Sequence, residues 1–327
     1  MRDREYRNLL AQVASLYYEE DLTQSEIGQR LGLSRVKIYR LLKEARGEGV
    51  VQITINWPVS RAVRLEQELK RVFGIREALV LETVQQDDAP LMHRLGQLGA
   101  RYLEQLLEDG MTMTVCLGRA TYEVIHAIRP GFRAKVHVAQ ALGSMPFSFQ
   151  ELDSATLARQ LATKLGGDVL YLSSPLMADS MEAAEVLKSQ RDIHRTLEAA
   201  RAADVALVGI GNLDPAISGF VRSGFVGVGE LEQLRQDGAI GDMGGQILTR
   251  DGQAHPCSYN QRMIGLTLEE LRQIPTTMAV AAGEEKAAAI LGALRTGVVD
   301  VICTDDRAAD GVLRLLNDPA VRVSGEA

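Results

Sequence analysis

The sequence predicts an α/β protein in which a winged helix-turn-helix domain precedes a mostly parallel α/β domain. Two observations lead to this prediction. Residues 22–46 contain two short capped helices joined by a tight turn, and the second of them is basic. From residue 77 onward, apolar strands alternate with helices, which is typical of a parallel sheet covered on both faces. Because 327 residues are too many for one ordinary domain, we expect segments 1–57, 58–76 and 77–327.

The N-terminal domain is expected to contain three helices. An apolar stripe at helical spacing predicts the first of them over residues 4–20. Thr23 and Glu26 have the spacing of a capping box at the start of the second helix. Gly32 is expected to end that helix in a left-handed conformation, and Ser34 is expected to cap the third. This arrangement is typical of a helix-turn-helix, whose recognition helix enters a DNA major groove.

The third helix is expected to present a basic outer face. Residues 33–46 hold five Lys or Arg residues and one acidic residue, although the whole chain has a net charge of −7. Positive charge focused on one helix suits contact with DNA phosphates. We expect the inner face to consist of Val36, Ile38, Leu41 and Leu42. We expect the DNA contacts to come from Thr23, Gln24, Ser34, Arg35, Lys37, Tyr39 and Arg40, with the three cations as the principal contacts. The alternative is a helical hairpin whose basic face is merely solvated.

Two predicted elements follow the recognition helix. The alternating apolar residues of segment 50–56 predict a strand, which would form a small wing. Trp57 and Pro58 break this pattern, and Ser60 is expected to cap an amphipathic helix that reaches about Phe73. We interpret this helix as a linker or a dimerisation helix in preference to a helix that packs on its own domain.

The remainder of the chain is expected to form the sheet and its covering helices. Apolar runs predict strands at 78–81, 113–117, 136–142, 168–172, 205–210, 277–281 and 299–303. Helices are predicted at 90–107, 120–128, 153–165, 181–188, 193–202, 284–295 and 307–316. Ligands of such sheets bind beyond the carboxyl ends of the strands.

Glycine and polar residues follow several of these predicted strands. Gly118 leads directly from a strand into a helix, where backbone N–H groups and the helix dipole favour an anion. Similar turns bring Gly143, Ser144, Gly211 and Glu284 to the same edge. Arg119, Thr121 and Lys286 would add charge and a donor, so the edge suits a phosphate. Asp242 is the only charged residue of the glycine-rich segment 238–246, which we expect to be a loop. We expect the Asp242 carboxylate to accept hydrogen bonds from sugar hydroxyls. The alternative is a turn aspartate bonded to its own backbone.

Several classes of protein are excluded or disfavoured by missing patterns. The glycine spacings of NAD-binding and ATP-binding loops do not occur, and no serine lies in a GxSxG motif. The five histidines lack metal-ligand spacing, so we predict no metal, no cofactor and no catalytic residues. Cys116, Cys257 and Cys303 are far apart, which suits free thiols in a reducing cytoplasm. The sequence contains neither an apolar run that would span a membrane nor an N-terminal signal segment.

Seven ordered blocks of the chain resemble the SorC-type, or DeoR-like sugar-binding, bacterial transcriptional regulators. These blocks are LTQSEIGQRLGLSRVKIYRLLKEAR, LGRATYEV, ADVALVGIGNLD, RSGF, GAIGDMGGQIL, NQRMIGLTLEELRQIP and AAGEEKAAAILGALRTG. The resemblance covers nearly the whole chain. It implies an effector domain that is similar in fold to sugar-phosphate isomerases and binds a phosphorylated sugar or polyol. It also implies an oligomer, usually a tetramer.

The resemblance assigns roles to five residues. Gly118, Arg119 and Thr121 match phosphate-binding positions, Asp242 matches a hydroxyl-binding position, and Lys286 matches a position that binds phosphate or a carbonyl group. Many members have threonine where this chain has Ala120, which removes one hydroxyl from the phosphate contact. Members that form a Schiff base use a lysine after the strand that ends near residue 142, and segment 140–144 has none.

The predicted function is that of a cytoplasmic, non-enzymatic transcriptional regulator. A dimer or tetramer would bind a palindromic double-stranded operator, and the sugar or polyol phosphate would change operator affinity. One alternative is a sugar-phosphate isomerase with an attached DNA module, in which Asp242 and Glu284 or Glu285 act as acid and base while Lys286 polarises a carbonyl. Another is a constitutive DNA-binding protein whose larger domain only oligomerises.

Overall fold

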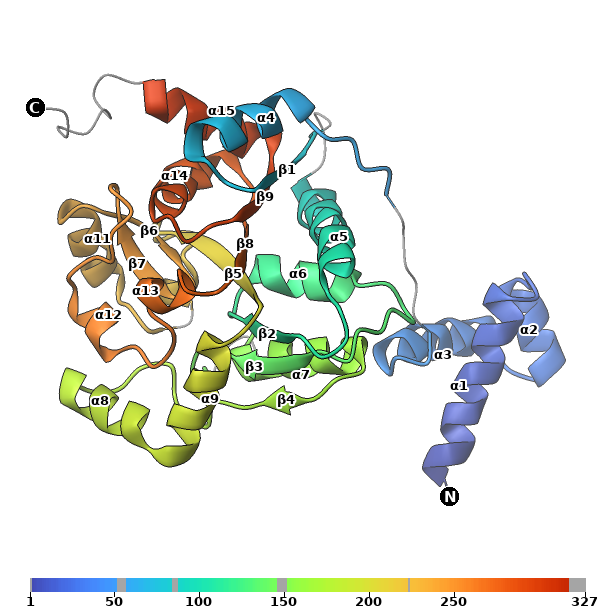
Figure 1. Cartoon of the computed structure of the whole chain (residues 1–327). Coiled ribbons are helices and arrows are strands. Elements are labelled where there is room, and N and C mark those ends of the chain that lie inside the picture. Colours follow the sequence, from blue (N-terminus) through green and yellow to red (C-terminus); the bar gives the residue numbers. More distant parts are fainter. Residues whose placement is uncertain (1, 52–56, 84–87, 146–151, 223, 318–327) are drawn as a thin grey trace, which may run out of the picture. The chain divides into compact units, whose positions relative to one another are not determined.

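The computed structural model describes residues 2–51, 57–83, 88–145, 152–222 and 224–317. The chain forms two compact units, Met1–Trp57 and Pro58–Ala327, and each is described by itself (Figure 1). The smaller unit is helical, and the larger unit contains the sheet.

The smaller unit consists of helices α1 (Arg2–Tyr18), α2 (Gln24–Leu31) and α3 (Arg35–Gly47). Both predicted caps are confirmed. The Thr23 hydroxyl accepts the N–H of Glu26 at 3.3 Å, while the Glu26 carboxylate accepts the N–H of Thr23 at 2.8 Å. Gly32 ends α2 with φ of 66°, and the Ser34 hydroxyl accepts the N–H of Lys37 at 3.2 Å. A Cβ atom at Gly28 would lie 2.6 Å from the carbonyl oxygen of Leu33, so the turn between α2 and α3 requires a glycine there.

The core of the smaller unit confirms most of the predicted inner face of α3. Ile38, Leu41 and Leu42 are buried together with Leu10, Val13, Leu16 and Ile27. The prediction for Val36 is wrong, because this side chain is 61% exposed. The predicted wing strand lies mostly outside the described residues, since only Val50 and Val51 of it are described, and both pack partly against the core.

Helix α4 (Val63–Phe73) belongs to the larger unit. Leu65 and Leu69 are buried in the same core as residues of the sheet. The expectation of a linker helix that does not pack on its own domain is therefore wrong. The predicted cap is also wrong, because α4 begins after Ala62 and no side chain caps it.

The larger unit is a mostly parallel sheet with the strand order β1-β9-β8-β5-β2-β3-β4. Its strands are β1 (Glu77–Leu81), β2 (Thr112–Val115), β3 (His137–Gln140), β4 (Val169–Leu170), β5 (Val205–Asn212), β8 (Thr276–Val280) and β9 (Val301–Asp305). Its longer helices are α5 (Asp88–Leu106), α6 (Arg119–Ala127), α7 (Ser154–Leu165), α8 (Met181–Ser189), α9 (Arg191–Arg201), α14 (Ala287–Arg295) and α15 (Asp306–Asn317). These elements confirm the predicted alternation, with the cap of α7 supplied by Asp153.

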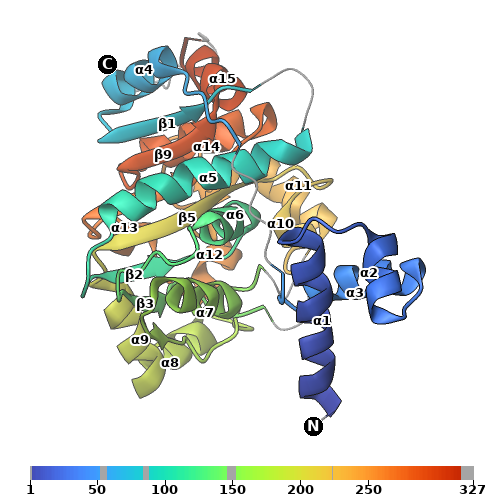
Figure 2. The same ribbon diagram turned by 90° about the vertical axis from the view of Figure 1, so that its right-hand side faces the viewer.

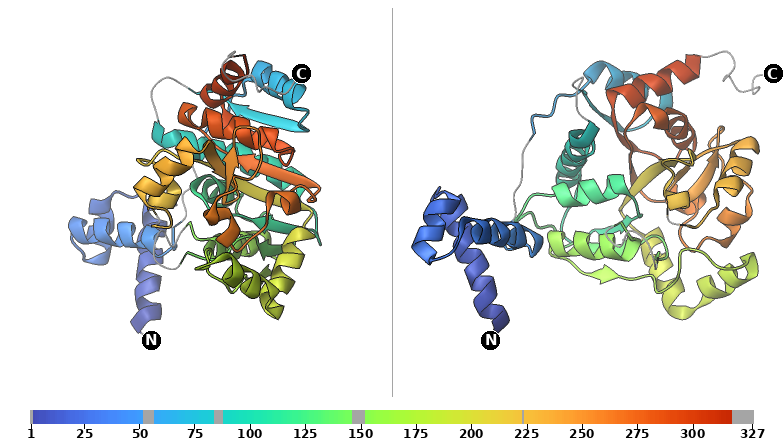
Figure 3. Two further views of the ribbon diagram at one scale, coloured as in Figure 1. Left: turned by 90° about the vertical axis from the view of Figure 1, so that its left-hand side faces the viewer. Right: turned by 180° about the vertical axis from the view of Figure 1, so that it is seen from behind.

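Two apolar cores hold helices on the two faces of this sheet. One core joins α5, α6 and α7 to one face, and Figure 2 looks onto that face. The other joins α4, α9, α14 and α15 to the opposite face, which the left view of Figure 3 shows. Alternate residues of a strand enter different cores, as Leu79 and Val80 of β1 do. The sheet is thus buried on both sides, as parallel sheets generally are.

The segment that we expected to be a glycine-rich loop is a β-hairpin. Strands β6 (Ala239–Met243) and β7 (Gln246–Thr249) pair with each other, and β6 also pairs antiparallel with the end of β5. Gly244 and Gly245 form the two-residue turn with φ of 57° and 82°. Shorter helices surround the hairpin: α10 (Gly219–Arg222), α11 (Val228–Gln236), α12 (Ser258–Arg262) and α13 (Leu268–Leu271), while the 3₁₀ turn η1 (Glu284–Lys286) precedes α14.

Candidate functional site: a basic helix and a cavity at the sheet edge

The smaller unit presents the residues predicted to contact DNA on its surface. Arg35, Lys37, Tyr39 and Arg40 are exposed on α3, and Ser34 is exposed at its start. Thr23 is exposed and Gln24 is half-buried at the start of α2. The Thr23 hydroxyl is engaged in the capping box, where it also lies 2.7 Å from the Glu26 carboxylate. The three cations predicted to contact DNA are therefore all exposed on α3, as a recognition helix requires.

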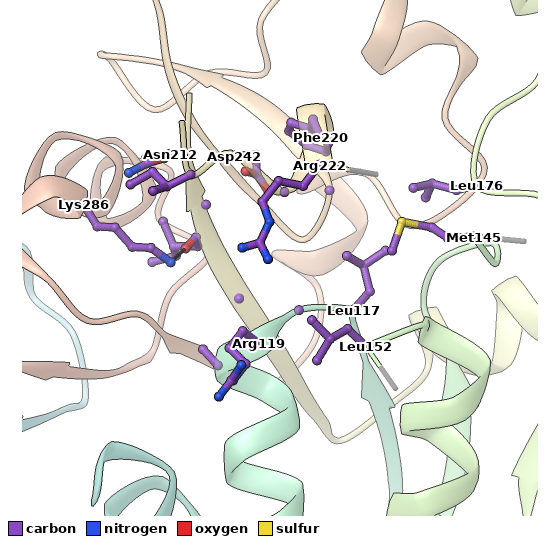
Figure 4. A pocket seen from close by; sticks show the side chains of 18 of the residues that line it. Leu117, Arg119, Met145, Leu152, Leu176, Asn212, Phe220, Arg222, Asp242 and Lys286 are labelled. Atoms are coloured by element: carbon purple, nitrogen blue, oxygen red, sulfur yellow. Dashed lines mark hydrogen bonds between the residues drawn. The ribbon is translucent and has the colours of Figure 1, made fainter. Parts of the chain in front are cut away.

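The larger unit contains a cavity of about 360 Å³ at the carboxyl ends of its central strands (Figure 4). Gly118 and Arg119 border it where β2 leads into α6, and Gly211 borders it near the end of β5. Asp242 reaches it from β6, and Lys286 reaches it from η1. The structure thus brings together five of the nine residues predicted to bind the effector.

The other four predicted residues do not line the cavity. The Thr121 side chain is fully buried, and its hydroxyl donates to the carbonyl oxygen of Gly118 at 2.8 Å. Gly143 packs against the backbone of Pro175, and the Ser144 hydroxyl lies 3.2 Å from the Gln140 amide nitrogen. Glu284 is exposed and forms an ion pair with Arg314 at 2.7 Å, whereas the neighbouring Glu285 lines the cavity. The expectation that Thr121 offers a free donor is therefore not met.

Asp242 and Lys286 occupy a poorly solvated part of the cavity. Burial raises the pKa of the Asp242 carboxyl group from 3.8 to about 7, against the opposing effect of the nearby Lys286. Burial also lowers the pKa of the Lys286 ammonium group, while Asp242 and Glu285 oppose that change. The Lys286 ammonium donates to the carbonyl oxygen of Ile210 at 2.8 Å. Ionic groups in such surroundings interact strongly with a charged or hydroxylated ligand.

Gly211 makes room for the Asp242 carboxylate. The two residues are directly opposite each other in the β5–β6 pair. A Cβ atom at position 211 would collide with the carboxylate, so a side chain there would displace Asp242. Position 211 therefore requires a glycine because the Asp242 carboxylate occupies the space of a side chain, and not only because of turn geometry.

Helix α6 begins at Arg119, and Gly118 is its N-cap residue. Gly118 has φ of 139°, a conformation that favours glycine, and the first N–H groups of a helix lack partners within it. The Arg119 side chain forms an ion pair with Glu123 on the next turn, with 2.8 Å between Nε and the carboxylate oxygen, and it remains 66% exposed. The start of α6 thus offers backbone donors to the cavity, and Arg119 places a cation at its border.

The comparisons with known proteins identify both units. The family model described as "Putative sugar-binding domain" matches residues 58–314, and the model of sigma-70 region 4 matches residues 11–47. The "Transcriptional regulator LsrR" of Klebsiella pneumoniae subsp. pneumoniae is 34% identical over 317 residues, which cover 94% of this chain and 93% of that protein. This chain belongs to the SorC/DeoR-like family of sugar-binding transcriptional regulators.

Two further members support this assignment over nearly the whole chain. The "Deoxyribonucleoside regulator" of Bacillus subtilis is 29% identical and covers 97% of this chain and 99% of its own length. The structure of the full-length sorbitol operon regulator SorC from Klebsiella pneumoniae has a TM-score of 0.70 and 27% identity, and covers 94% of this chain and 99% of that one. The resemblance stated from the sequence is confirmed, and the protein is a sugar-sensing, DNA-binding regulator.

The cavity of this SorC/DeoR-like regulator also contains residues that the sequence analysis missed. Asn212 and Arg222 add polar groups, and Phe220, Leu117, Met145, Leu152, Leu176 and Ile217 add apolar surface. Figure 4 shows the Arg222 side chain extending from α10 into the cavity. Asn212 follows the glycines of β5 and could have been found by its place at the strand end. Arg222 comes from a short helix outside the sheet, so no strand pattern pointed to it.

The structure adds two facts about the described part of the regulator. None of its helices there combines the length and the apolar character that crossing a bilayer requires. Among the same residues, no three His, Cys, Asp or Glu side chains converge in the manner of a metal site. The named relatives are transcriptional regulators.

Proposed function

We propose that the cavity binds a phosphorylated sugar or polyol and that its occupancy changes the affinity of the protein for operator DNA. The observation that carries this proposal is the convergence of the α6 N-terminus, Lys286 and Asp242 in one cavity. A helix N-terminus with an adjacent cation suits a phosphate group. The half-buried carboxyl group of Asp242, on another element of the cavity, suits hydroxyl groups. Together they match the two kinds of group that a sugar phosphate carries.

In this proposal, each end of the ligand has its own partners. The phosphate contacts the backbone donors that follow Gly118 and the ammonium group of Lys286, and Arg119 or Arg222 adds charge. The hydroxyls contact Asp242 and Asn212. The Asn212 side-chain nitrogen is buried and has no hydrogen-bond partner among the residues that the structure describes. Because an unpaired buried donor is costly, a ligand oxygen near it would be stabilising.

The DNA-binding part of the proposal assigns the operator contacts to α3. Arg35, Lys37 and Arg40 contact bases and phosphates, and Ser34, Tyr39, Thr23 and Gln24 lie close enough to the same surface to assist. We further propose that the protein acts in the cytoplasm as a dimer or tetramer on a palindromic operator. Two-fold symmetry of such an oligomer would be matched by two half-sites.

A thermal-shift screen of the full chain tests the effector. Each sugar or polyol phosphate is compared with its unphosphorylated parent. A ligand at 100 times its dissociation constant should stabilise the protein by about 2.7 kcal/mol. We expect this shift with a phosphate, its loss in Lys286→Ala, and its retention in the matched control Lys188→Ala, because Lys188 on α8 lies outside the cavity. A shift with an unphosphorylated sugar alone would contradict the phosphate assignment.

A second comparison tests whether the smaller unit binds the operator while the larger unit binds the effector. We expect Arg35→Ala to weaken operator binding and to keep the thermal shift. We expect Lys286→Ala to keep operator binding and to lose the effect of the ligand on it. Equal loss of operator binding in both variants would contradict the proposal. Steady conversion of the bound phosphosugar, abolished in Asp242→Ala, would show an enzyme instead of a sensor.

A further inference from the structure

The recognition helix exposes an apolar side chain among its cations. Val36 is 61% exposed, although valine is one of the residues most often buried. The core below α3 is filled by Ile38, Leu41 and Ala45, each of which is fully buried. The core therefore leaves Val36 to the surface.

The position of Val36 follows from the geometry of the helix. An α-helix turns by about 100° per residue, so Val36 lies on the side of α3 that is nearly opposite Ile38 and Ala45. Arg40 and Lys43 lie one and two turns further along the same side, and Tyr39 lies beside them. All three are exposed. Val36 is thus near the middle of the outward face.

Val36 also lies in the first turn of α3. Ser34 is the N-cap, so Val36 is the second residue of the helix. The N-terminal residues of a recognition helix are those that contact base edges. A side chain at this place, flanked by cations that attract phosphates, would face the floor of the major groove when α3 enters it.

We propose that Val36 reads thymine in the operator through the 5-methyl group of the base. The valine side chain offers no hydrogen-bonding group, and the thymine methyl is the apolar feature that the major groove displays. Two methyl groups on a β-branched side chain with few rotamers form a fixed apolar surface, which suits discrimination between thymine and other bases. The proposal rests on the assignment of α3 to the major groove, made above.

The test uses the full-length protein and a duplex selected by that protein from a random-sequence pool. Each thymine of the duplex is replaced in turn by deoxyuridine, which lacks only the methyl group. Loss of one buried methyl contact corresponds to about four-fold weaker binding in one half-site, or about fifteen-fold when both half-sites are changed. We expect this effect at one or two thymines of each half-site, and we expect Val36→Ala to abolish it there.

Two further variants give the test its controls. Val186→Ala changes a valine that is 60% exposed on α8, so the uridine effect should persist in it. Arg40→Ala distinguishes the reading of thymine by Val36 from the entry of α3 into the major groove. If Arg40→Ala weakens binding but every uridine effect is the same in wild type and Val36→Ala, then α3 enters the groove and the reading of thymine by Val36 is refuted. If neither variant changes binding, the assignment of α3 to the groove has failed as well.

Discussion

Replacing Asp242 with asparagine should make the stability of the larger unit less sensitive to pH. Burial raises the pKa of this carboxyl group in the folded protein to about 7, from 3.8. The folded state therefore holds a proton between these pH values that the unfolded state releases, and stability falls as the pH rises through this window. Each pH unit of the window corresponds to about 1.4 kcal/mol. Between pH 5 and pH 8, about two such units are crossed, so the wild type should lose about 2–3 kcal/mol relative to Asp242→Asn.

Thermal unfolding of both proteins from pH 5 to pH 8 measures this difference. For a unit of this size, about 2–3 kcal/mol corresponds to roughly 5 °C, which should appear as a gain of Asp242→Asn over wild type that grows with pH and levels off above pH 7. Asp251→Asn is the matched control, because Asp251 is an exposed residue in the turn after β7. A difference between Asp242→Asn and wild type that stays constant with pH would refute the reasoning.

Three other substitutions test separate parts of the structure. Gly211→Ala should displace the Asp242 carboxylate and weaken effector binding measured by calorimetry, with little change in the circular dichroism of the fold. Leu69→Ala should lower the unfolding free energy of the larger unit by about 2–5 kcal/mol in urea titrations, whereas the partly exposed Val72→Ala should cost far less. Ser34→Ala should destabilise the smaller unit by about 1 kcal/mol, since the cap on α3 is lost.

The sequence predicted the elements whose signals are local. The caps of α2 and α3 depend on residues three positions apart, and the strands of the sheet are short apolar runs. The packing of α4 is not local, because Leu65 and Leu69 share a core with residues of β9 and α15, which come more than two hundred positions later. The amphipathic pattern therefore predicted that α4 buries one face, but it could not show which surface covers that face.

The sequence could not show which side chains point into the cavity. Glu284 and Glu285 are adjacent, yet only Glu285 borders the cavity while Glu284 pairs with Arg314. Thr121 lies in the first turn of α6, where its hydroxyl bonds to the carbonyl oxygen of Gly118 instead of reaching the cavity. Such choices depend on a rotation of the helix or on one torsion angle of the side chain, which the order of residues does not determine.

Because Asp242 lies on a β-hairpin and not on a loop, we expect it to bind a ligand differently. As part of a loop, Asp242 would be ordered by the ligand, and binding would include the entropic cost of that ordering. In the structure, Asp242 lies on β6 between β5 and β7, and its carboxylate rests against Gly211. The Gly-Gly turn between two apolar stretches is a sequence signal for this hairpin. The carboxyl group is thus held in place before a ligand arrives. Its protonation state near pH 7 should therefore control how well it accepts hydrogen bonds from ligand hydroxyl groups, and the ordering of a loop should matter less. Effector affinity should accordingly rise with pH through this region in the wild type and remain flat in Asp242→Asn.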